Sequence, residues 1–477
     1  MSPELIERLR EYGQSHLIDH YESLSGSARE RLRQQLEQID FPQLQRLIRE
    51  AQRADVPSDG ESIAAKASRA RAPSSLVRLP RSDREIALWR AATAEGEALL
   101  KAGKVGAILV AGGQGTRLGF DAPKGTFPIG PISGHSLYQI LAEQVLARSR
   151  RAGAAIPYYI MTSDATHEPT VAFFEQHRYF GLDPDNVRFF RQGTMPAVDC
   201  RTGQILLAAP GELATSPDGH GGVLAALRRE GLLEEMRQRG IEQLHYHQVD
   251  NPLAIVCDPA FLGLHLLHDS EVSTKVVAKT GPEEKMGVVV EIDGVTQIIE
   301  YSDLPDEIAQ RRTPDGELEL WAGNTAIHVF NREFLERILN QALEMPFHRA
   351  HKKVPYLDAT GNIVEPAEPN AWKFERFIFD VLPHARKALV VETDRAREFN
   401  PVKNREGVNS PADVQQNMSR LFAGWLREAG VNVPEGVPVE ISPLFALDAA
   451  EVARRLDRTR PIEGPVYLGP SASSPSP

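Results

Sequence analysis

Apolar residues recur at helical spacing over residues 1–54, with charged side chains between them. The repeating positions are Leu5, Leu9, Leu17, Leu32, Leu36, Ile39, Leu44 and Leu47. This is the pattern of amphipathic helices, and the Asp-Phe-Pro sequence at 40–42 predicts a boundary between two of them. A Ser-, Pro-, Ala- and Arg-rich stretch over 55–81 indicates a connecting segment, and another helix is expected at 83–101. We therefore predict a helical N-terminal region over residues 1–95.

The middle of the chain alternates between short apolar runs and longer helical patterns. The run from Val105 to Ala111 ends in glycines, which is typical of a buried strand in a parallel sheet. Further strand-like runs cover 158–162, 187–191, 243–249, 274–278 and 287–292, and helical stretches cover 137–148, 169–177 and 223–239. The alternation predicts an α/β central domain over 96–395 with a mixed, mainly parallel sheet. We expect a small C-terminal domain over 396–463 and a disordered Ser/Pro-rich tail over 464–477.

Composition and charge narrow the class of protein. The chain has 477 residues, too many for one hydrophobic core, and its formal net charge is -11. This acidic balance argues against general binding to nucleic acid or to an anionic membrane, since both need a basic surface. No apolar run approaches the length of a membrane span, and the N-terminus is too charged for a secretion signal. With only two cysteines, Cys200 and Cys257, a reducing compartment is favoured, and we expect a cytoplasmic protein.

The most informative segment is a glycine-rich stretch that follows the predicted strand at 105–111. It reads Ala-Gly-Gly-Gln-Gly-Thr-Arg-Leu-Gly over 111–119 and continues as Pro-Lys-Gly at 123–125. Glycines at a strand end allow backbone N–H groups to approach a phosphate, and Arg117 and Lys124 add two positive charges. The segment lacks the Gly-Lys-Ser/Thr of a Walker A loop and the spacing of a dinucleotide fingerprint. It therefore predicts a site for a polyanion such as a nucleoside triphosphate.

The glycine-rich stretch is one of several short motifs that occur in a characteristic order. The others are YIMTS at 159–163, QGxMP at 192–196, PDGxGG at 217–222, VDN at 249–251, GVV at 287–289, EYS at 300–302, GN at 323–324 with His328, and FNPVKN at 399–404. Together they resemble the UDP-N-acetylhexosamine (UDP-N-acetylglucosamine) pyrophosphorylases, within the UDP-glucose pyrophosphorylase-type (UDPGP type 1) nucleotidylyltransferases. The order and spacing match over residues 5 to 445, nearly the whole chain.

The resemblance implies a Rossmann-like, GT-A-like central domain that binds UTP along the carboxyl edge of its sheet. By this resemblance the nucleotide contacts Val110, Ala111, Gly112 and Gly113, and its uracil is held by Gln192 and Gly219. The chemistry supports Gln192, because a side-chain amide offers both the donor and the acceptor that a uracil edge requires.

One carboxylate is expected to bind the metal ion at the phosphates, and three basic residues are expected to bind the phosphates themselves. Asp250 ends the strand-like run at 243–249, where an aspartate facing a triphosphate is a natural Mg²⁺ ligand. The resemblance implies that Lys403, from the C-terminal region, reaches the phosphates and joins Arg117 and Lys124 as a catalytic group. Because two anions must meet and charge builds on the leaving pyrophosphate, positioning and electrostatic stabilisation would carry most of the catalysis.

The sugar phosphate would be bound by a second set of residues. The resemblance implies that Gly287, Glu300 and Asn324 contact the sugar, and a carboxylate such as Glu300 can accept hydrogen bonds from sugar hydroxyls. His220 stands where the acetylhexosamine enzymes carry asparagine, and the residue there is expected near the sugar or the α-phosphate. This difference leaves the identity of the sugar open between N-acetylglucosamine, glucose and galactose 1-phosphate.

The resulting prediction is a Mg²⁺-dependent uridylyltransferase that converts UTP and N-acetylglucosamine 1-phosphate into UDP-N-acetylglucosamine and pyrophosphate. One alternative is uridylyl transfer to glucose or galactose 1-phosphate, and another is a nucleotide-sugar sensor without turnover. A guanylyl- or adenylyltransferase is a further rival, against which Gln192 argues. The expected partners are UTP and a sugar 1-phosphate, without nucleic acid or membrane, and the oligomeric state, monomer or dimer, stays open.

Overall fold

The computed structural model describes residues 1–53, 63–341, 345–456, 462 and 464–470. The chain forms two compact units. The smaller unit consists of Met1–Ser62, Gln192–Ala225 and Glu344–Asp380, and the larger consists of Ile63–Arg191, Ala226–Leu343 and Val381–Pro477. This division differs from the linear one expected from the sequence, because segments far apart in the chain fold together in each unit.

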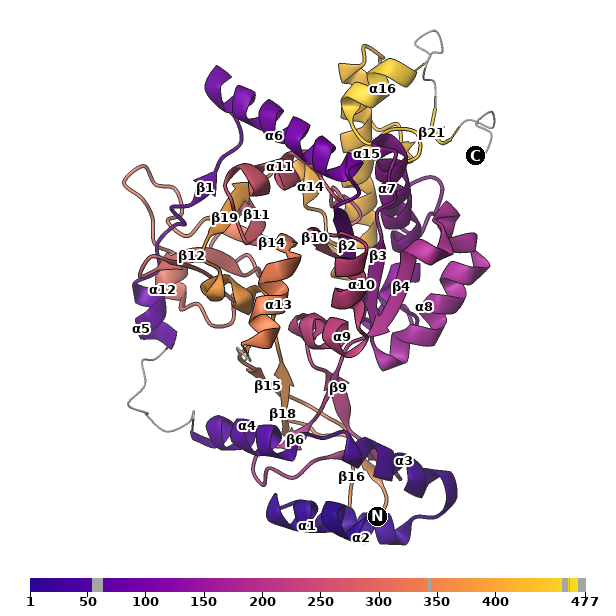
Figure 1. The fold of residues 1–477 in the computed structure, drawn as a ribbon, viewed down its shortest axis with the longest axis vertical. Helices are drawn as coiled ribbons and strands as arrows, with labels where there is room; N and C mark the ends of the chain where they lie inside the picture. The colour runs from indigo at the N-terminus through magenta and orange to yellow at the C-terminus, as the bar shows by residue number, and fades with distance from the viewer. Residues whose placement is uncertain (54–62, 342–344, 457–461, 463, 471–477) are drawn as a thin grey trace. The chain divides into compact units, whose positions relative to one another are not determined.

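A mixed, mainly parallel sheet runs through the larger unit, as the sequence predicts (Figure 1). Its strands lie in the order β1 (Leu76–Val77), β19 (Ala388–Glu392), β11 (Val272–Ala278), β14 (Ala322–Asn331), β10 (Gln243–Gln248), β2 (Val105–Val110), β3 (Tyr158–Thr162) and β4 (Val187–Arg191). Strand β14 is antiparallel to both of its neighbours, and the other pairs along this order are parallel. A hairpin of β12 (Val288–Ile292) and β13 (Val295–Ile299) joins β14.

The larger unit also contains helices, and its buried apolar residues form one large cluster and smaller separate ones. The helices are α5 (Ile63–Ser68), α6 (Asp83–Lys101), α7 (Leu137–Ala152), α8 (Asp164–Gln176), α10 (Leu232–Gln238), α11 (Pro259–Leu267), α12 (Asp306–Ala309), α13 (Arg332–Asn340) and α14 (Arg395–Glu398). Helix α6 begins at a capping box, in which the Ser82 hydroxyl accepts the N–H of Glu85 and the Glu85 carboxylate accepts the N–H of Ser82. Ala107 and Leu109 of β2 are fully buried in the core, which explains the apolar run in the sequence.

The C-terminal segment also belongs to the larger unit. It contains α15 (Pro411–Glu428), β20 (Val439–Ile441), α16 (Ala449–Arg455) and β21 (Val466–Leu468). The structure differs here from the expected disordered tail over 464–477, because β21 pairs in parallel with β20. The rest of that expectation, over 471–477, lies outside the described residues.

The smaller unit combines helices from the N-terminus with strands from two later segments. Its helices are α1 (Pro3–Glu11), α2 (His16–Ser23), α3 (Gly26–Glu37), α4 (Phe41–Arg53) and the first residues of α9 (Val223–Arg229), since the division of the chain falls after Ala225. Its strands are β5 (Thr194–Pro196), β6 (Val198–Asp199), β7 (Leu207–Ala209), β8 (Glu212–Leu213), β9 (Thr215–Pro217), β15 (His348–Lys352), β16 (Tyr356–Leu357), β17 (Ile363–Val364) and β18 (Ala371–Glu375). The apolar faces of the first four helices share one core with Val198, Trp372 and Phe374. The helical N-terminus predicted from periodicity is therefore present, and α4 begins at Phe41 as the predicted boundary requires.

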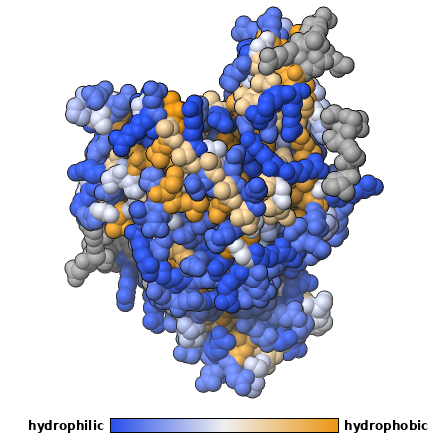
Figure 2. All heavy atoms as spheres, turned by 45° about the horizontal axis from the view of Figure 1, so that its top comes forward, coloured by the Kyte–Doolittle hydropathy of each residue, from blue (hydrophilic) through white to orange (hydrophobic). Residues whose placement is uncertain are grey.

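The face of the protein drawn in Figure 2 is mostly polar. Figure 2 shows hydrophilic side chains over most of the visible face and apolar ones gathered mainly in its upper half. Over the described ranges, no helix combines the length and apolarity that a membrane crossing requires.

Candidate active site

The glycine-rich stretch and Asp250 lie at the same edge of the large sheet. Strands β2 and β10 are parallel neighbours in which Gln248 pairs with Val110, so their carboxyl ends coincide. The N–H of Val249 donates to the carbonyl of Val110 at 3.0 Å, and Asp250 follows directly. Ligands of open α/β sheets bind at this edge, beyond the carboxyl ends of the strands. The segment from Val110 to Gly113 and Asp250 are thus brought together as expected.

The glycine-rich stretch folds back on itself and thereby positions Lys124. The N–H of Lys124 donates to the carbonyl of Gly113 at 3.1 Å, and the N–H of Gly115 donates to the carbonyl of Ala122 at 2.9 Å. Gly125 rests on the ring of Tyr138 so closely that a methyl carbon at this glycine would lie 2.2 Å from the ring. Only glycine fits there, and the contact fixes the backbone next to Lys124.

Lys124 and Asp250 form a direct ion pair. The Nζ atom of Lys124 lies 3.6 Å from Oδ2 of Asp250, and each side chain keeps 16% of its surface exposed. Both groups are thus partly buried yet still accessible to a ligand. A cation and a carboxylate held together at a strand edge can receive a phosphate and a divalent metal ion at adjacent positions.

Lys403 reaches the same edge through hydrogen bonds between the C-terminal segment and the end of β10. The N–H of Val402 donates to the carbonyl of Asp250 at 2.8 Å. The amide of Asn251 accepts the N–H of Asn400 at 3.1 Å and donates to the carbonyl of Glu398 at 2.8 Å. Asn251 therefore ties residues 398–403 to the strand end that carries Asp250.

Arg117 and a further arginine, Arg405, add positive charge around the glycine-rich stretch. Arg117 is an exposed residue of the 3₁₀ turn Thr116–Leu118, and among the described residues its guanidinium has no hydrogen-bond or ion-pair partner. The guanidinium of Arg405 lies against Gly119, where a methyl carbon would be 3.7 Å from Arg405 Nε. Sequence reasoning missed Arg405. Its position directly after the FNPVKN motif was the available signal, but only the fold shows that it returns to the glycine-rich stretch.

The three residues of the larger unit that were expected to bind the sugar also lie together. The N–H of Asn324 donates to the carbonyl of Gly287 at 2.8 Å. A methyl carbon at Gly287 would lie 3.0 Å from Oε1 of Glu300, so the Glu300 carboxylate packs directly against this glycine. Asn324 is on β14 beside the carboxyl end of β11, which runs parallel to β10. These residues therefore belong to the same edge of the sheet as Asp250.

A buried ion triad supports this edge from within the larger unit. The Nζ atom of Lys275 lies 2.7 Å from Oδ2 of Asp258 and 2.6 Å from Oε1 of Glu398. Burial alone lowers the pKa of Lys275, but the two carboxylates outweigh it and raise that pKa above its ordinary value. Glu398 also accepts the N–H of Ile255, so the triad links β11, the segment after Asp250 and the start of residues 398–403.

The remaining predicted residues, Gln192, Gly219 and His220, lie in the smaller unit. Gln192 is buried, and its amide nitrogen lies 3.5 Å from the carbonyl oxygen of Gly219. Gly219 has φ +86°, and a methyl carbon there would lie 2.3 Å from the carbonyl oxygen of Arg376. The turn thus needs glycine for both its conformation and its contact. The two predicted uracil ligands are neighbours.

The ring of His220 is held in an apolar setting. It stacks on Phe377, with centroids 5.3 Å apart, and its Nδ1 accepts the N–H of Ile378 at 3.2 Å. Burial, with a smaller contribution from His348, lowers the pKa of His220 to about 4. His220 is therefore neutral at pH 7 and offers no positive charge to a phosphate.

Comparison with known proteins gives a consistent result. A family model described as UTP–glucose-1-phosphate uridylyltransferase matches residues 64–422. UDP-N-acetylglucosamine diphosphorylase 2 of Arabidopsis thaliana is 37% identical over 97% of this chain and 93% of its own. UDP-N-acetylglucosamine pyrophosphorylase of Saccharomyces cerevisiae is 38% identical, with coverages of 91% and 92%.

Solved structures agree with these relatives. The uridine diphosphate N-acetylglucosamine pyrophosphorylase from Trypanosoma brucei, in complex with an inhibitor, superimposes with a TM-score of 0.85 over 99% of each chain, at 27% identity. The resemblance seen in the sequence motifs is confirmed, and with it the nucleotidyltransferase fold. This chain belongs to the UTP–glucose-1-phosphate uridylyltransferase family and is a nucleotidyltransferase of the UDP-sugar pyrophosphorylase type.

Proposed function

We propose that this enzyme transfers uridylyl from UTP to N-acetylglucosamine 1-phosphate and releases pyrophosphate. The observation that carries the proposal is the ion pair of Lys124 and Asp250 at the sheet edge to which Asn251 ties the segment of Lys403. The sugar-binding candidates lie along the same edge, as the register of β14 with β11 indicates. The names of the Arabidopsis and yeast relatives favour N-acetylglucosamine as the sugar.

The chemistry that these residues would support is an in-line displacement at the α-phosphorus of UTP. A phosphate oxygen of the sugar 1-phosphate forms the new P–O bond, and the bond to the β-phosphate oxygen breaks. The attacking phosphate is already ionised at neutral pH, so no general base is required. Arg117, Lys124, Lys403 and Arg405 would hold the reacting phosphates and the charge that develops on pyrophosphate. Gln192 and Gly219 stay the predicted uracil ligands.

The residues present fit a Mg²⁺ ion held between protein and nucleotide. Mg²⁺ commonly takes one or two carboxylates and completes its octahedron with phosphate oxygens and water. Asp250 offers one carboxylate at the strand end, and across the described residues no cluster of three or more His, Cys, Asp or Glu could hold the ion alone. Asp250 would therefore bind the ion together with UTP, and the bound ion would neutralise phosphate charge. The cytoplasmic location stays a prediction.

The test is pyrophosphate release by the purified protein with Mg²⁺ and UTP across a panel of sugar 1-phosphates. Faster release with N-acetylglucosamine 1-phosphate than with glucose or galactose 1-phosphate is expected. A preference for glucose or galactose 1-phosphate would keep the chemistry and overturn the sugar assignment. If the protein binds UTP but releases no pyrophosphate with any sugar 1-phosphate, the enzyme proposal is overturned in favour of a nucleotide-sugar sensor.

A further inference from the structure

The hydroxyl of Ser163 contacts the backbone of the glycine-rich stretch. Ser163 lies between the end of β3 and the start of α8, and its Oγ donates to the carbonyl of Gly112 at 2.8 Å. Val110 of β2 pairs in parallel with Met161 of β3, so Gly112 and Ser163, each two residues further on, lie side by side. Ser163 is buried, with 4% of its surface exposed, and no step of the reaction described above involves it.

A neighbouring threonine determines how the Ser163 hydroxyl is oriented. The Oγ1 atom of Thr166 accepts the N–H of Ser163 at 3.0 Å and lies 3.0 Å from Ser163 Oγ. A carbonyl oxygen can only accept, so the single hydroxyl proton of Ser163 goes to Gly112. The Thr166 hydroxyl is therefore the donor in its contact with Ser163 Oγ. Because Thr166 is fully buried, this short chain of hydrogen bonds holds the serine hydroxyl in one direction.

The contact with Ser163 orients the peptide group between Gly112 and Gly113. The carbonyl of Gly112 and the N–H of Gly113 belong to one planar trans peptide, so they point in opposite directions. The next carbonyl, that of Gly113, accepts the N–H of Lys124, which orients the N–H of Gln114 in the same way. Over the residues that the structure describes, the N–H groups of Gly113 and Gln114 donate to no protein acceptor. Both residues are exposed, so these two donors are available to a ligand.

The protein itself does not require glycine at position 113. The φ angle of Gly113 lies outside the left-handed region, and a methyl carbon at this residue would meet no atom within 4 Å. Open space therefore lies beside this part of the backbone. A ligand that approaches the N–H of Gly113 closely gives a physical reason for the missing side chain.

We propose that Ser163 is a positioning residue for UTP, which holds the peptide between Gly112 and Gly113 so that the N–H of Gly113 faces the phosphates. The inference rests on the proposed function, which assigns the phosphates to this edge of the sheet. A donor that is already oriented binds a phosphate more tightly, because less conformational entropy is lost on binding. Without the serine hydroxyl, the carbonyl of Gly112 loses its partner in the protein, and the peptide is no longer held in this orientation.

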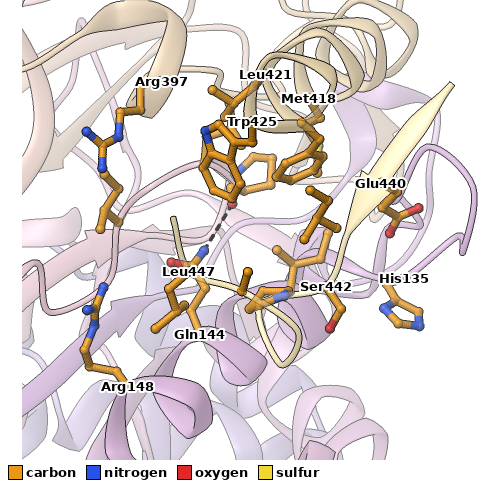
Figure 3. A pocket seen from close by; sticks show the side chains of 18 residues that line it. His135, Gln144, Arg148, Arg397, Met418, Leu421, Trp425, Glu440, Ser442 and Leu447 are labelled. Atoms are coloured by element: carbon orange, nitrogen blue, oxygen red, sulfur yellow. Dashed lines mark hydrogen bonds between the residues drawn. The ribbon is translucent and has the colours of Figure 1, made fainter. Parts of the chain in front are cut away.

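Calorimetric titration of the full-length protein with UTP tests the inference in Ser163→Ala. The Kd for UTP is expected to rise about tenfold, the scale of one hydrogen bond to a charged group. Ser442→Ala is the matched control, because the Ser442 hydroxyl is also buried and donates to Glu143 at 2.9 Å. Figure 3 shows Ser442 in a pocket beside α7 and α15, among residues that have no role at the glycine-rich stretch. Thermal denaturation should show similar losses of stability in the two variants, but only Ser163→Ala should lose affinity for UTP.

A spectroscopic measurement observes the proposed donor directly. In protein labelled with ¹⁵N-glycine, saturating UTP should shift the amide resonance of Gly113 in the wild type and shift it less in Ser163→Ala. Gly113→Ala assigns this resonance by removing it. The added methyl group has room in the protein, so this variant is expected to fold and to bind UTP more weakly.

The double variant of Ser163→Ala and Gly113→Ala shows whether the serine acts through this peptide. It should bind UTP about as weakly as Gly113→Ala alone, because two changes that affect one contact are not additive. Wild-type affinity in Ser163→Ala, an equal loss of affinity in Ser442→Ala, additive losses in the double variant, or a Gly113 resonance that UTP does not shift would overturn this inference alone. If the wild type does not bind UTP, the proposed function is overturned together with it.

Discussion

Lys124 Nζ lies 3.6 Å from Asp250 Oδ2, although 125 positions separate the two residues in the sequence. The pair joins the glycine-rich stretch after β2 to the end of β10. The pair places a fixed positive charge at the proposed phosphate position and a fixed negative charge at the adjacent proposed metal position. Such preorganised charges are the main source of electrostatic catalysis. The predictions below test this edge of the sheet and the interactions that support it.

Lys124→Met should lower kcat by on the order of a hundredfold or more, the cost of removing one preorganised charge stabiliser. Lys101→Met, which removes an exposed lysine at the end of α6, is the matched control and should keep full activity. Initial rates of pyrophosphate release give both values. Near-normal turnover in Lys124→Met would remove this lysine from the mechanism.

Asp250→Asn should weaken the response to Mg²⁺, because an amide is a poorer ligand for a hard cation than a carboxylate. We expect the Mg²⁺ concentration for half-maximal rate to rise by about tenfold or more, in line with the scale of lost charge-assisted contacts. Asp83→Asn in the first turn of α6 is the control. A Mg²⁺ titration that matches the wild-type curve would contradict the assignment of Asp250.

Arg405→Gln should raise KM for UTP by about tenfold, which corresponds to roughly 1.4 kcal/mol of lost binding. The expectation follows from the contact of its guanidinium with Gly119, in the stretch proposed to hold the triphosphate. Arg420→Gln, on α15, is the matched control because it removes an exposed arginine elsewhere in the same C-terminal segment. Steady-state kinetics with UTP as the varied substrate decide the question, and an unchanged KM would exclude Arg405 from the site.

Lys275→Met should lower the free energy of unfolding by about 3–5 kcal/mol, because it leaves Asp258 and Glu398 buried without their cation. Lys104→Met is the control, since Lys104 pairs with Glu242 at an exposed position. An exposed pair contributes only about 0–1 kcal/mol. Urea denaturation followed by tryptophan fluorescence measures both variants. Equal losses in the two would show that the buried triad has no special role.

Acid should destabilise the protein below about pH 6.5, the ordinary pKa of histidine. Burial lowers the pKa of His247 to about 3 and that of His265 to about 4. Between these values and 6.5 the unfolded chain binds protons that the folded chain does not, so stability falls as pH falls. His247→Leu should reduce the slope of unfolding free energy against pH between 7 and 5. An identical slope in this variant would show that His247 does not contribute.

Local sequence features predicted the parts of the fold that depend on neighbouring residues. The apolar run at 105–111 gave β2 because its side chains are buried on both faces of the sheet. The runs at 158–162 and 187–191 match β3 and β4, while the helical stretch at 223–239 is divided between α9 and α10. Gly231, with φ +68°, separates these two helices. Periodicity could not reveal this break, since the apolar pattern continues across it.

The candidate site residues that sequence patterns could not place are held by contacts between distant segments. Asn251 binds the backbone of Glu398 and Asn400, and the N–H of Val402 donates to the carbonyl of Asp250. These contacts bring the segment of Lys403 to the edge that carries Asp250. Arg405 returns to Gly119 by the same route. Nothing in the local sequence around either basic residue specifies its partner, because loop residues take their positions from the elements that anchor them.

The sequence by itself determined the class of fold and the family, and it predicted a phosphate-binding stretch from Ala111 to Lys124, because these depend on short-range pattern and spacing. The tertiary structure decided the composition of the two units, the ion pair of Lys124 with Asp250, and the neutral state of His220. These features depend on which distant segments pack together and on the burial that results. Burial and long-range pairing shift the pKa of a titratable group and so determine its protonation state. Neither can be predicted from the residues next to that group in the sequence.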